Sequence, residues 1–144
     1  MRSYLVVGNQ TLDSPELAEA IRERVATEPT AAFYLVVPAT QAGGGRLTWD
    51  EDQARAAAQE RLTATLNRLH AIGVVASGEV GCDDPIQATR DALRHREVDE
   101  VILSTLPTGI SRWLGQDVPS KLKGSIEVPV AVVTTQKLPA STPG

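Results

Sequence analysis

The chain has 144 residues, a net charge of −4, and 42% hydrophobic and 22% charged residues. This length fits one domain with a single core, and the balance of apolar and charged residues excludes an intrinsically disordered chain. The acidic charge and an aromatic content of 3% argue against a nucleic-acid partner, because a positive field and stacking platforms are both missing. No apolar run reaches the roughly 20 residues of a membrane-spanning helix, and the start lacks the apolar length of a signal peptide. We therefore expect a cytoplasmic protein.

The first part of the chain predicts a strand, a helix and a second strand. The apolar run over residues 4–7 is typical of a strand buried on both faces. Asp13 is predicted to cap the following helix, with Pro15 in its first turn, where the missing N–H costs nothing. Residues 32–37 form a second apolar run, which Pro38 is expected to end.

The middle of the chain predicts a long helix between two loops. Residues 39–48 include three consecutive glycines and are expected to form a surface loop. A helix is predicted from a cap at Asp50 to Ile72, where Gly73 ends it in a left-handed conformation. Residues 74–80 follow as a third strand, which we place near an edge of the sheet because polar residues interrupt it.

The clearest helix start is Asp84-Pro85-Ile86-Gln87, which combines a cap, a first-turn proline and a capping-box glutamine. The buried-type run Val101-Ile102-Leu103 lies inside residues 98–105, which we predict to be a fourth strand. A loop over residues 106–116 is expected after it.

The last part of the chain predicts a short helix and a final strand. Asp117 opens the helix, with Pro119 in its first turn. Residues 128–133 form the fifth strand, which is expected either at an edge or to pair only through its later residues, because Pro129 has no N–H to give to a neighbouring strand. Residues 136–144 are polar and proline-punctuated, so we expect a disordered tail after a domain that spans residues 1–135.

Strands that alternate with helices predict an open α/β fold, with a five-stranded parallel sheet and four helices joined by right-handed crossovers. The pattern leaves the strand order open. In such sheets ligands bind beyond the carboxyl ends of the strands, where the strand order reverses. The candidate loops are residues 8–12, 38–45, 81–84 and 104–116.

Four segments together resemble the universal stress protein family. They are Gly-Cys-Asp-Asp-Pro at residues 81–85, residues 98–103, Gly-Ile-Ser-Arg-Trp-Leu-Gly at residues 109–115, and Val-Pro-Val-Ala-Val-Val at residues 128–133. The order of elements over residues 4–133 is also the family's. The resemblance implies a Rossmann-like fold of the adenine nucleotide alpha hydrolase type and, for one subclass of the family, ATP binding.

That subclass binds ATP through a loop after the fourth strand, which reads glycine, two residues, glycine, nine residues, glycine and then Ser or Thr. Glycines are needed because backbone N–H groups must approach the phosphate oxygens closely. An ungapped alignment places Leu103, Leu106 and Gln116 at the three glycine positions of this chain. If Ser104 takes the first position instead, Pro107 occupies the second. Tight ATP binding of the usual kind is therefore not expected.

Two positions retain part of the family's pattern. Gly115 keeps the third glycine after a shift of one residue. The family usually has an aspartate just after the first strand to hold adenine or ribose, and Gly8 and Asn9 stand there in this chain. Because Asn9 can donate and accept hydrogen bonds, the change weakens adenosine binding without abolishing it. ATP and AMP are the candidate ligands.

The candidate ligand-binding residues lie on the loops at the carboxyl ends of the first, second and fourth strands. Asn9, Gln10 and Thr11 either form a polar collar around a nucleoside or satisfy the open N–H groups of the first helix. Arg112 either holds a phosphate by a charge-assisted fork or lies on a solvated loop. The full set is Gly8, Asn9, Gln10, Thr11, Val37, Pro38, Ser104, Thr105, Thr108, Gly109, Ser111, Arg112, Gly115 and Gln116.

The sequence has no nucleophile elbow, no Walker loop and no metal-ligand spacing around its histidines. We therefore expect a non-catalytic binding module that forms a homodimer through the exposed edge of the last strand, Val130, Ala131, Val132 and Val133. Two alternatives remain at this point. One is an ATP or AMP sensor or a nucleotide-processing enzyme on the same fold, and the other is a flavodoxin-like carrier, suggested by residues 8–11.

Overall fold

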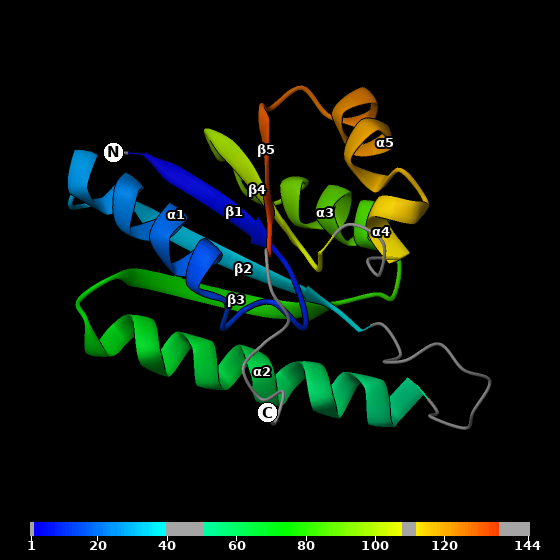
Figure 1. Ribbon diagram of the computed structural model, residues 1–144, viewed down its shortest axis with the longest axis horizontal. Coiled ribbons are helices and arrows are strands. Elements are labelled where there is room, and N and C mark those ends of the chain that lie inside the picture. Colours follow the sequence, from blue (N-terminus) through cyan, green and yellow to red (C-terminus); the bar gives the residue numbers. More distant parts are fainter. Residues whose placement is uncertain (1, 40–50, 108–111, 136–144) are drawn as a thin grey trace.

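The computed structural model describes residues 2–39, 51–107 and 112–135. A five-stranded, wholly parallel sheet crosses these residues in the order β3-β2-β1-β4-β5 (Figure 1). The predicted α/β fold class is confirmed, and the strands expected near an edge, β3 and β5, are the two edge strands. The strands are β1 (Ser3–Val7), β2 (Ala32–Pro38), β3 (Val75–Gly81), β4 (Glu100–Thr105) and β5 (Val130–Thr134).

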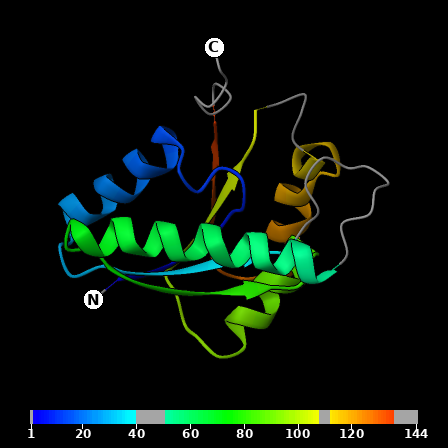
Figure 2. The ribbon, with the colours of Figure 1, turned by 90° about the horizontal axis from the view of Figure 1, so that it is seen from below.

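Helices cover both faces of the sheet, as right-handed crossovers between parallel strands require. Helices α1 and α2 pack on one face, and α3, α4 and α5 pack on the other (Figures 1 and 2). Within the described residues, no helix combines the length and apolarity needed to cross a membrane. The helices are α1 (Pro15–Thr27), α2 (Glu51–Ala71), α3 (Pro85–Leu93), α4 (Arg112–Gly115) and α5 (Val118–Ser125). The short helix α4 lies inside the segment that was expected to be a loop.

The close approach of α2 to the sheet depends on a glycine. A Cβ atom on Gly78 of β3 would lie 2.5 Å from the carbonyl oxygen of Leu35 and 2.7 Å from Cδ1 of Leu62, so only glycine fits there. On the same face, the rings of Tyr4 and Phe33 stack with their centroids 5.1 Å apart. This layer fixes α2 against β2 and β3, and α2 reaches the carboxyl edge of the sheet from there.

The first helix begins one residue later than predicted. Ser14, not Asp13, is the N-cap, and its Oγ accepts a hydrogen bond from the N–H of Leu17 at 3.1 Å. The reason is Pro15, which occupies the first helical position and forces the residue before it into an extended conformation. Asp13 is exposed and lies outside the helix.

Of the other three predicted caps, Asp50 lies outside the described residues, and Asp84 and Asp117 differ from each other. Asp84 caps α3 as predicted, because its carboxylate accepts from the N–H of Ile86 at 2.9 Å. Gln87 does not complete a capping box, since its side chain donates to Asp91 at 2.8 Å. Asp117 precedes α5 in a left-handed conformation, with φ of 58° and no side-chain cap. Its backbone conformation, rather than its carboxylate, marks the start of that helix.

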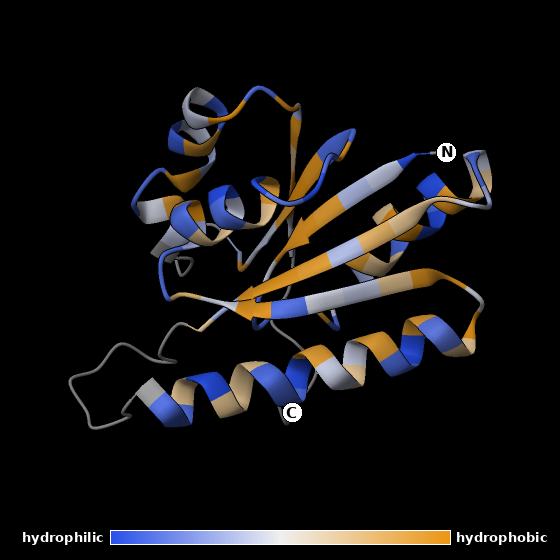
Figure 3. Ribbon diagram, turned by 180° about the vertical axis from the view of Figure 1, so that it is seen from behind, coloured by the Kyte–Doolittle hydropathy of each residue, from blue (hydrophilic) through white to orange (hydrophobic). Residues whose placement is uncertain are grey.

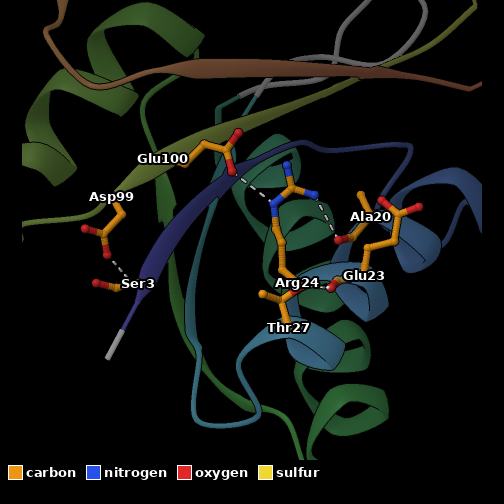
Figure 4. Close-up of polar contacts among 7 residues, drawn as sticks. All are labelled: Ser3, Ala20, Glu23, Arg24, Thr27, Asp99 and Glu100. Carbon is orange, nitrogen blue, oxygen red and sulfur yellow. Dashed lines mark hydrogen bonds and ion pairs between the residues drawn. The ribbon is translucent and has the colours of Figure 1, made fainter.

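The amino ends of β1 and β4 are tied to α1 and to each other by polar contacts (Figure 4). The N–H of Ser3 donates to a carboxylate oxygen of Asp99 at 2.8 Å. Arg24 donates from Nε to Glu100 at 3.0 Å and from its guanidinium to the carbonyl of Ala20 at 2.9 Å. This ion pair is partly buried, so it positions α1 over the sheet more firmly than an exposed pair would.

Candidate functional site

The candidate site is the carboxyl edge of the sheet between β1 and β4. The strand order reverses there, because β1 pairs with β2 on one side and with β4 on the other. In open α/β sheets this reversal separates the loops that follow the two strands and leaves a crevice for a ligand. The loop after β1, the ends of β2 and β4, and the middle of α2 supply the polar side chains described below.

Asn9 links three elements at this edge. Its side chain is 5% exposed, and its Nδ2 donates to the carbonyl oxygen of Pro38 at the end of β2, at 2.7 Å. Its Oδ1 accepts from the guanidinium of Arg61 on α2, also at 2.7 Å. These contacts match neither sequence-based interpretation in full, because they join Asn9 to the end of β2 and to α2. It holds the loop after β1 to its neighbours.

Thr11 and Ser104 close the gap between β1 and β4. They are 2% and 1% exposed, and their Oγ atoms share a hydrogen bond of 2.5 Å that connects the loop after β1 to β4. Gly8 lies against the same pair, since a Cβ on it would come within 3.2 Å of the Ser104 Cβ and 3.3 Å of the Leu12 Cδ2. Protein atoms therefore fill the point where the strand order reverses.

Three other candidate residues, Val37, Thr105 and Gln10, are buried or half-buried within the fold. Val37 is fully buried in the core between the sheet and helices α1 and α2, so its side chain does not face the carboxyl-edge loops. Thr105 donates from Oγ1 to the hydroxyl of Thr134 at 3.2 Å and so joins β4 to β5. Gln10 is half-buried next to Asn9.

The segment after β4 carries the remaining candidates. Gly115 and Gln116 are exposed at the end of α4, and a Cβ on Gly115 would meet nothing within 4 Å. Trp113 packs against the core under α3 and α5, as expected for a side chain that plugs the space beneath a loop. Outside the described residues lie Thr108, Gly109, Ser111 and the side chain of Arg112.

Sequence reasoning missed two arginines of α2 that flank the loop after β1. Arg61 contacts Asn9, and Arg68 donates to the carbonyl of Leu12 at 3.5 Å and to Thr65 at 3.3 Å. Among the described side chains, no carboxylate forms an ion pair with either arginine. Both positions border the buried stripe of α2, and an arginine beside an apolar stripe is a signal that the helical pattern contained. They make this side of the candidate site electropositive.

The predicted dimer edge is strand β5, whose residues 130–133 are all at least partly exposed. Val132 of β5 is 36% exposed, and Val130, Ala131 and Val133 are half-buried. The outer side of β5 pairs with no other described strand, in agreement with its predicted edge position. No group of three or more His, Cys, Asp or Glu side chains suited to a metal ion occurs in residues 2–39, 51–107 and 112–135.

Three solved structures are similar to this chain. A universal stress protein from Archaeoglobus fulgidus has a TM-score of 0.62 and 15% identity over 92% of this chain and 93% of its own. A universal stress protein family member from Burkholderia pseudomallei has a TM-score of 0.59 and 15% identity, covering 91% and 94% of the two chains. An Arabidopsis thaliana member of that family, with AMP bound, has a TM-score of 0.62 and 12% identity, covering 100% and 97%.

No protein-family model and no curated protein sequence matches the chain. The similarity to universal stress protein structures over nearly its whole length therefore confirms the sequence-based resemblance at the level of the fold. The chain has the Rossmann-like fold that the resemblance implied.

Proposed function

We propose that this chain, with the fold of the universal stress proteins, is a non-catalytic regulatory module that binds an adenine mononucleotide weakly between the carboxyl ends of β1 and β4. The observation that carries the proposal is the state of the polar side chains there. Asn9 is hydrogen-bonded to Pro38 and Arg61, and Thr11 is hydrogen-bonded to Ser104. The fold supplies the place for a nucleotide, and the chain has already used the donors and acceptors that would hold it tightly.

A ligand at this edge has to compete with internal contacts. Separating a buried pair such as Thr11 and Ser104 without full replacement costs about 1–3 kcal/mol for each group left unsatisfied. A dissociation constant near 1 mM corresponds to about −4 kcal/mol, so such costs are enough to reduce a micromolar site to a millimolar one. Weak binding follows directly from the saturated hydrogen bonds.

Two observations favour an adenine mononucleotide as the ligand. The similar Arabidopsis structure has AMP bound, and that structure covers all of this chain. Arg61 and Arg68 give the β1 side a positive flank that suits an anion. A triphosphate is disfavoured, because the second glycine of the family's loop is replaced either by Leu106, which brings a side chain, or, in the other alignment, by Pro107, which lacks an N–H.

Isothermal titration calorimetry with AMP and ATP, together with a phosphate-release assay, tests this function. We expect AMP to bind with a dissociation constant of about 1 mM, ATP to bind no more tightly, and no phosphate release above background. Arg61→Ala should weaken AMP binding several-fold, whereas Arg55→Ala, at an exposed position on another side of α2, should leave it unchanged. Micromolar ATP binding, or hydrolysis that follows the purified protein, would show that the proposal is wrong.

We also propose that two copies pair through β5. Its outer edge offers unpaired backbone groups and the exposed side chain of Val132, which are the features that a second strand covers. Sedimentation of the native protein should give a dimer, and Val132→Lys should shift it toward the monomer. A control, Val75→Lys on the opposite edge strand, should leave the dimer intact.

A further inference from the structure

A second hollow lies at the opposite edge of the sheet, at the amino ends of β1, β2 and β3. Its volume is about 220 Å³, and the segment after α3 forms one wall through His95, Arg96 and Glu97. Figure 3 shows that, on this face, α3 lies toward the carboxyl ends of the strands and no helix is drawn over the amino halves of β2 and β3. The hollow is therefore separate from the site between β1 and β4.

Arg96 is held in this hollow by an aromatic ring. Its guanidinium carbon lies 3.5 Å from the centroid of the Tyr34 ring, a stacked cation–π contact. The hydroxyl of Tyr34 donates to Glu79 on β3 at 2.6 Å, so the ring itself is anchored. Burial, followed by the contact with Glu79, raises the pKa of Tyr34, which keeps the phenol a neutral donor. Arg96 opposes this shift through its charge and a hydrogen bond to the phenol, and the remaining N–H groups of its stacked guanidinium suit a planar partner.

Two further donors that line the hollow have no side-chain hydrogen-bond partner among the described residues. Ser77 of β3 pairs in register with Tyr34 on β2, and its exposed hydroxyl makes no hydrogen bond to any described residue. The imidazole of His95 is likewise exposed and has no bond to another described side chain. Arg94 differs from its neighbours, since it forms an ion pair with Asp91 at 3.2 Å. Arg96, His95 and Ser77 thus remain as donors for a bound molecule.

We propose that this hollow is a binding site for a small oxyanion, a carboxylate or a phosphate, with Arg96 as the forked donor and Ser77 and His95 beside it. Arginine stacked on a ring recognises a planar carboxylate or a phosphate through two parallel hydrogen bonds. A hollow of this volume has room for a small molecule such as a carboxylate or a phosphate. Two carboxylates lie nearby. Glu79 accepts a hydrogen bond from Tyr34, and Glu97 lines the hollow next to Arg96 in the sequence.

Backbone amide NMR titrations at constant ionic strength test this site, with inorganic phosphate and with acetate as separate probes. We expect saturable shifts at the amides of Ser77 and Arg96, with a millimolar dissociation constant for at least one probe. Arg96→Ala should abolish the saturable shifts, and Ser77→Ala should weaken binding about threefold. A response to phosphate alone assigns a phosphate ligand, and a response to acetate alone assigns a carboxylate ligand.

The matched control is Arg94→Ala, which removes an equal charge two residues away and should leave the titration unchanged. Equal losses in the Arg94 and Arg96 variants would reduce the effect to general charge attraction and overturn the proposal, and so would the absence of saturable shifts in the native protein. A further titration with AMP separates the two sites. AMP should shift amides near Asn9 and Thr11, so a failure at one edge of the sheet leaves the result at the other intact.

Discussion

The polar side chains at the two edges of the sheet differ in burial and in hydrogen bonding. At the carboxyl edge, where open α/β sheets commonly bind ligands, Asn9, Thr11 and Ser104 are buried and hydrogen-bonded to other parts of the protein. At the amino edge, the exposed hydroxyl of Ser77 has no hydrogen bond to a described residue, and the exposed Arg96 is stacked on the ring of Tyr34. The topology of a sheet indicates where a ligand site can lie. The affinity of that site for a ligand depends on whether its polar groups are already hydrogen-bonded within the protein.

The strongest test of the closed carboxyl edge is Asn9→Ala. This change leaves the carbonyl of Pro38 and the guanidinium of Arg61 without their buried partner, and we expect a loss of about 2–3 kcal/mol in the free energy of unfolding. Urea denaturation measures it, and the m-value should not change. Gln10→Ala, a half-buried neighbour, is the control and should cost under about 0.5 kcal/mol. Equal effects of the two changes would mean that Asn9 does not hold this edge together.

A double-mutant cycle on Thr11 and Ser104 tests the second contact at the same edge. Thr11→Val or Ser104→Ala alone leaves a buried hydroxyl unsatisfied and should cost about 1–2 kcal/mol. The double variant should cost about 1 kcal/mol less than the sum of the two, because no orphan hydroxyl remains. Thermal denaturation of the four proteins gives the coupling. Strictly additive losses would contradict a closed Thr11–Ser104 pair.

The sequence was sufficient to predict the fold class and the strands, because each strand has a local pattern of residue types. Apolar runs, and an alternating pattern for the third strand, predicted all five strands to within two residues at each end, and Pro129 predicted an edge position for the last strand. Strand order was beyond reach, since it depends on which crossovers pack together and not on any local pattern. The wrong cap at Asp13 had a local cause: Pro15 dictated the conformation of Ser14, and that restraint outweighed the preference for Asp.

The candidate site was predictable only in part. Asn9, Thr11 and Ser104 were identified because Asn9 and Thr11 follow β1 and Ser104 lies at the end of β4, and the carboxyl ends of these strands meet at one edge. Their bonding was not predictable, because Arg61 approaches from a helix 52 residues away and Ser104 lies 93 residues from Thr11. A pattern of residue types shows which side chains reach an edge of the sheet. The pattern does not show whether these side chains hydrogen-bond to each other or are free to bind a ligand.

At the amino edge, Tyr34→Phe should change how stability depends on pH. Burial and the hydrogen bond to Glu79 raise the Tyr34 pKa above 10.0, and Arg96 opposes this only in part. The folded state therefore favours the neutral phenol, whose contribution is complete below pH 10 and declines as pH rises through the raised pKa. Near neutral pH we expect a loss under about 1 kcal/mol from Tyr34→Phe. Above pH 10 the gap between the two proteins should narrow in urea denaturation, and a constant gap would contradict the assignment.

The smallest expected change in the free energy of unfolding is that of Ser77→Ala at the amino edge, and it contrasts with the larger change expected for Ser104→Ala at the carboxyl edge. Ser77→Ala removes a hydroxyl that is exposed and makes no hydrogen bond to a described residue, so the free energy of unfolding should change by less than about 0.5 kcal/mol. The same deletion at Ser104, where the hydroxyl is buried and bonded, should cost several times more. Parallel urea denaturation of the two serine variants gives the ratio. A loss at Ser77 as large as the loss at Ser104 would mean that the amino edge uses its polar groups for stability, and the difference between a closed edge and an open one would disappear.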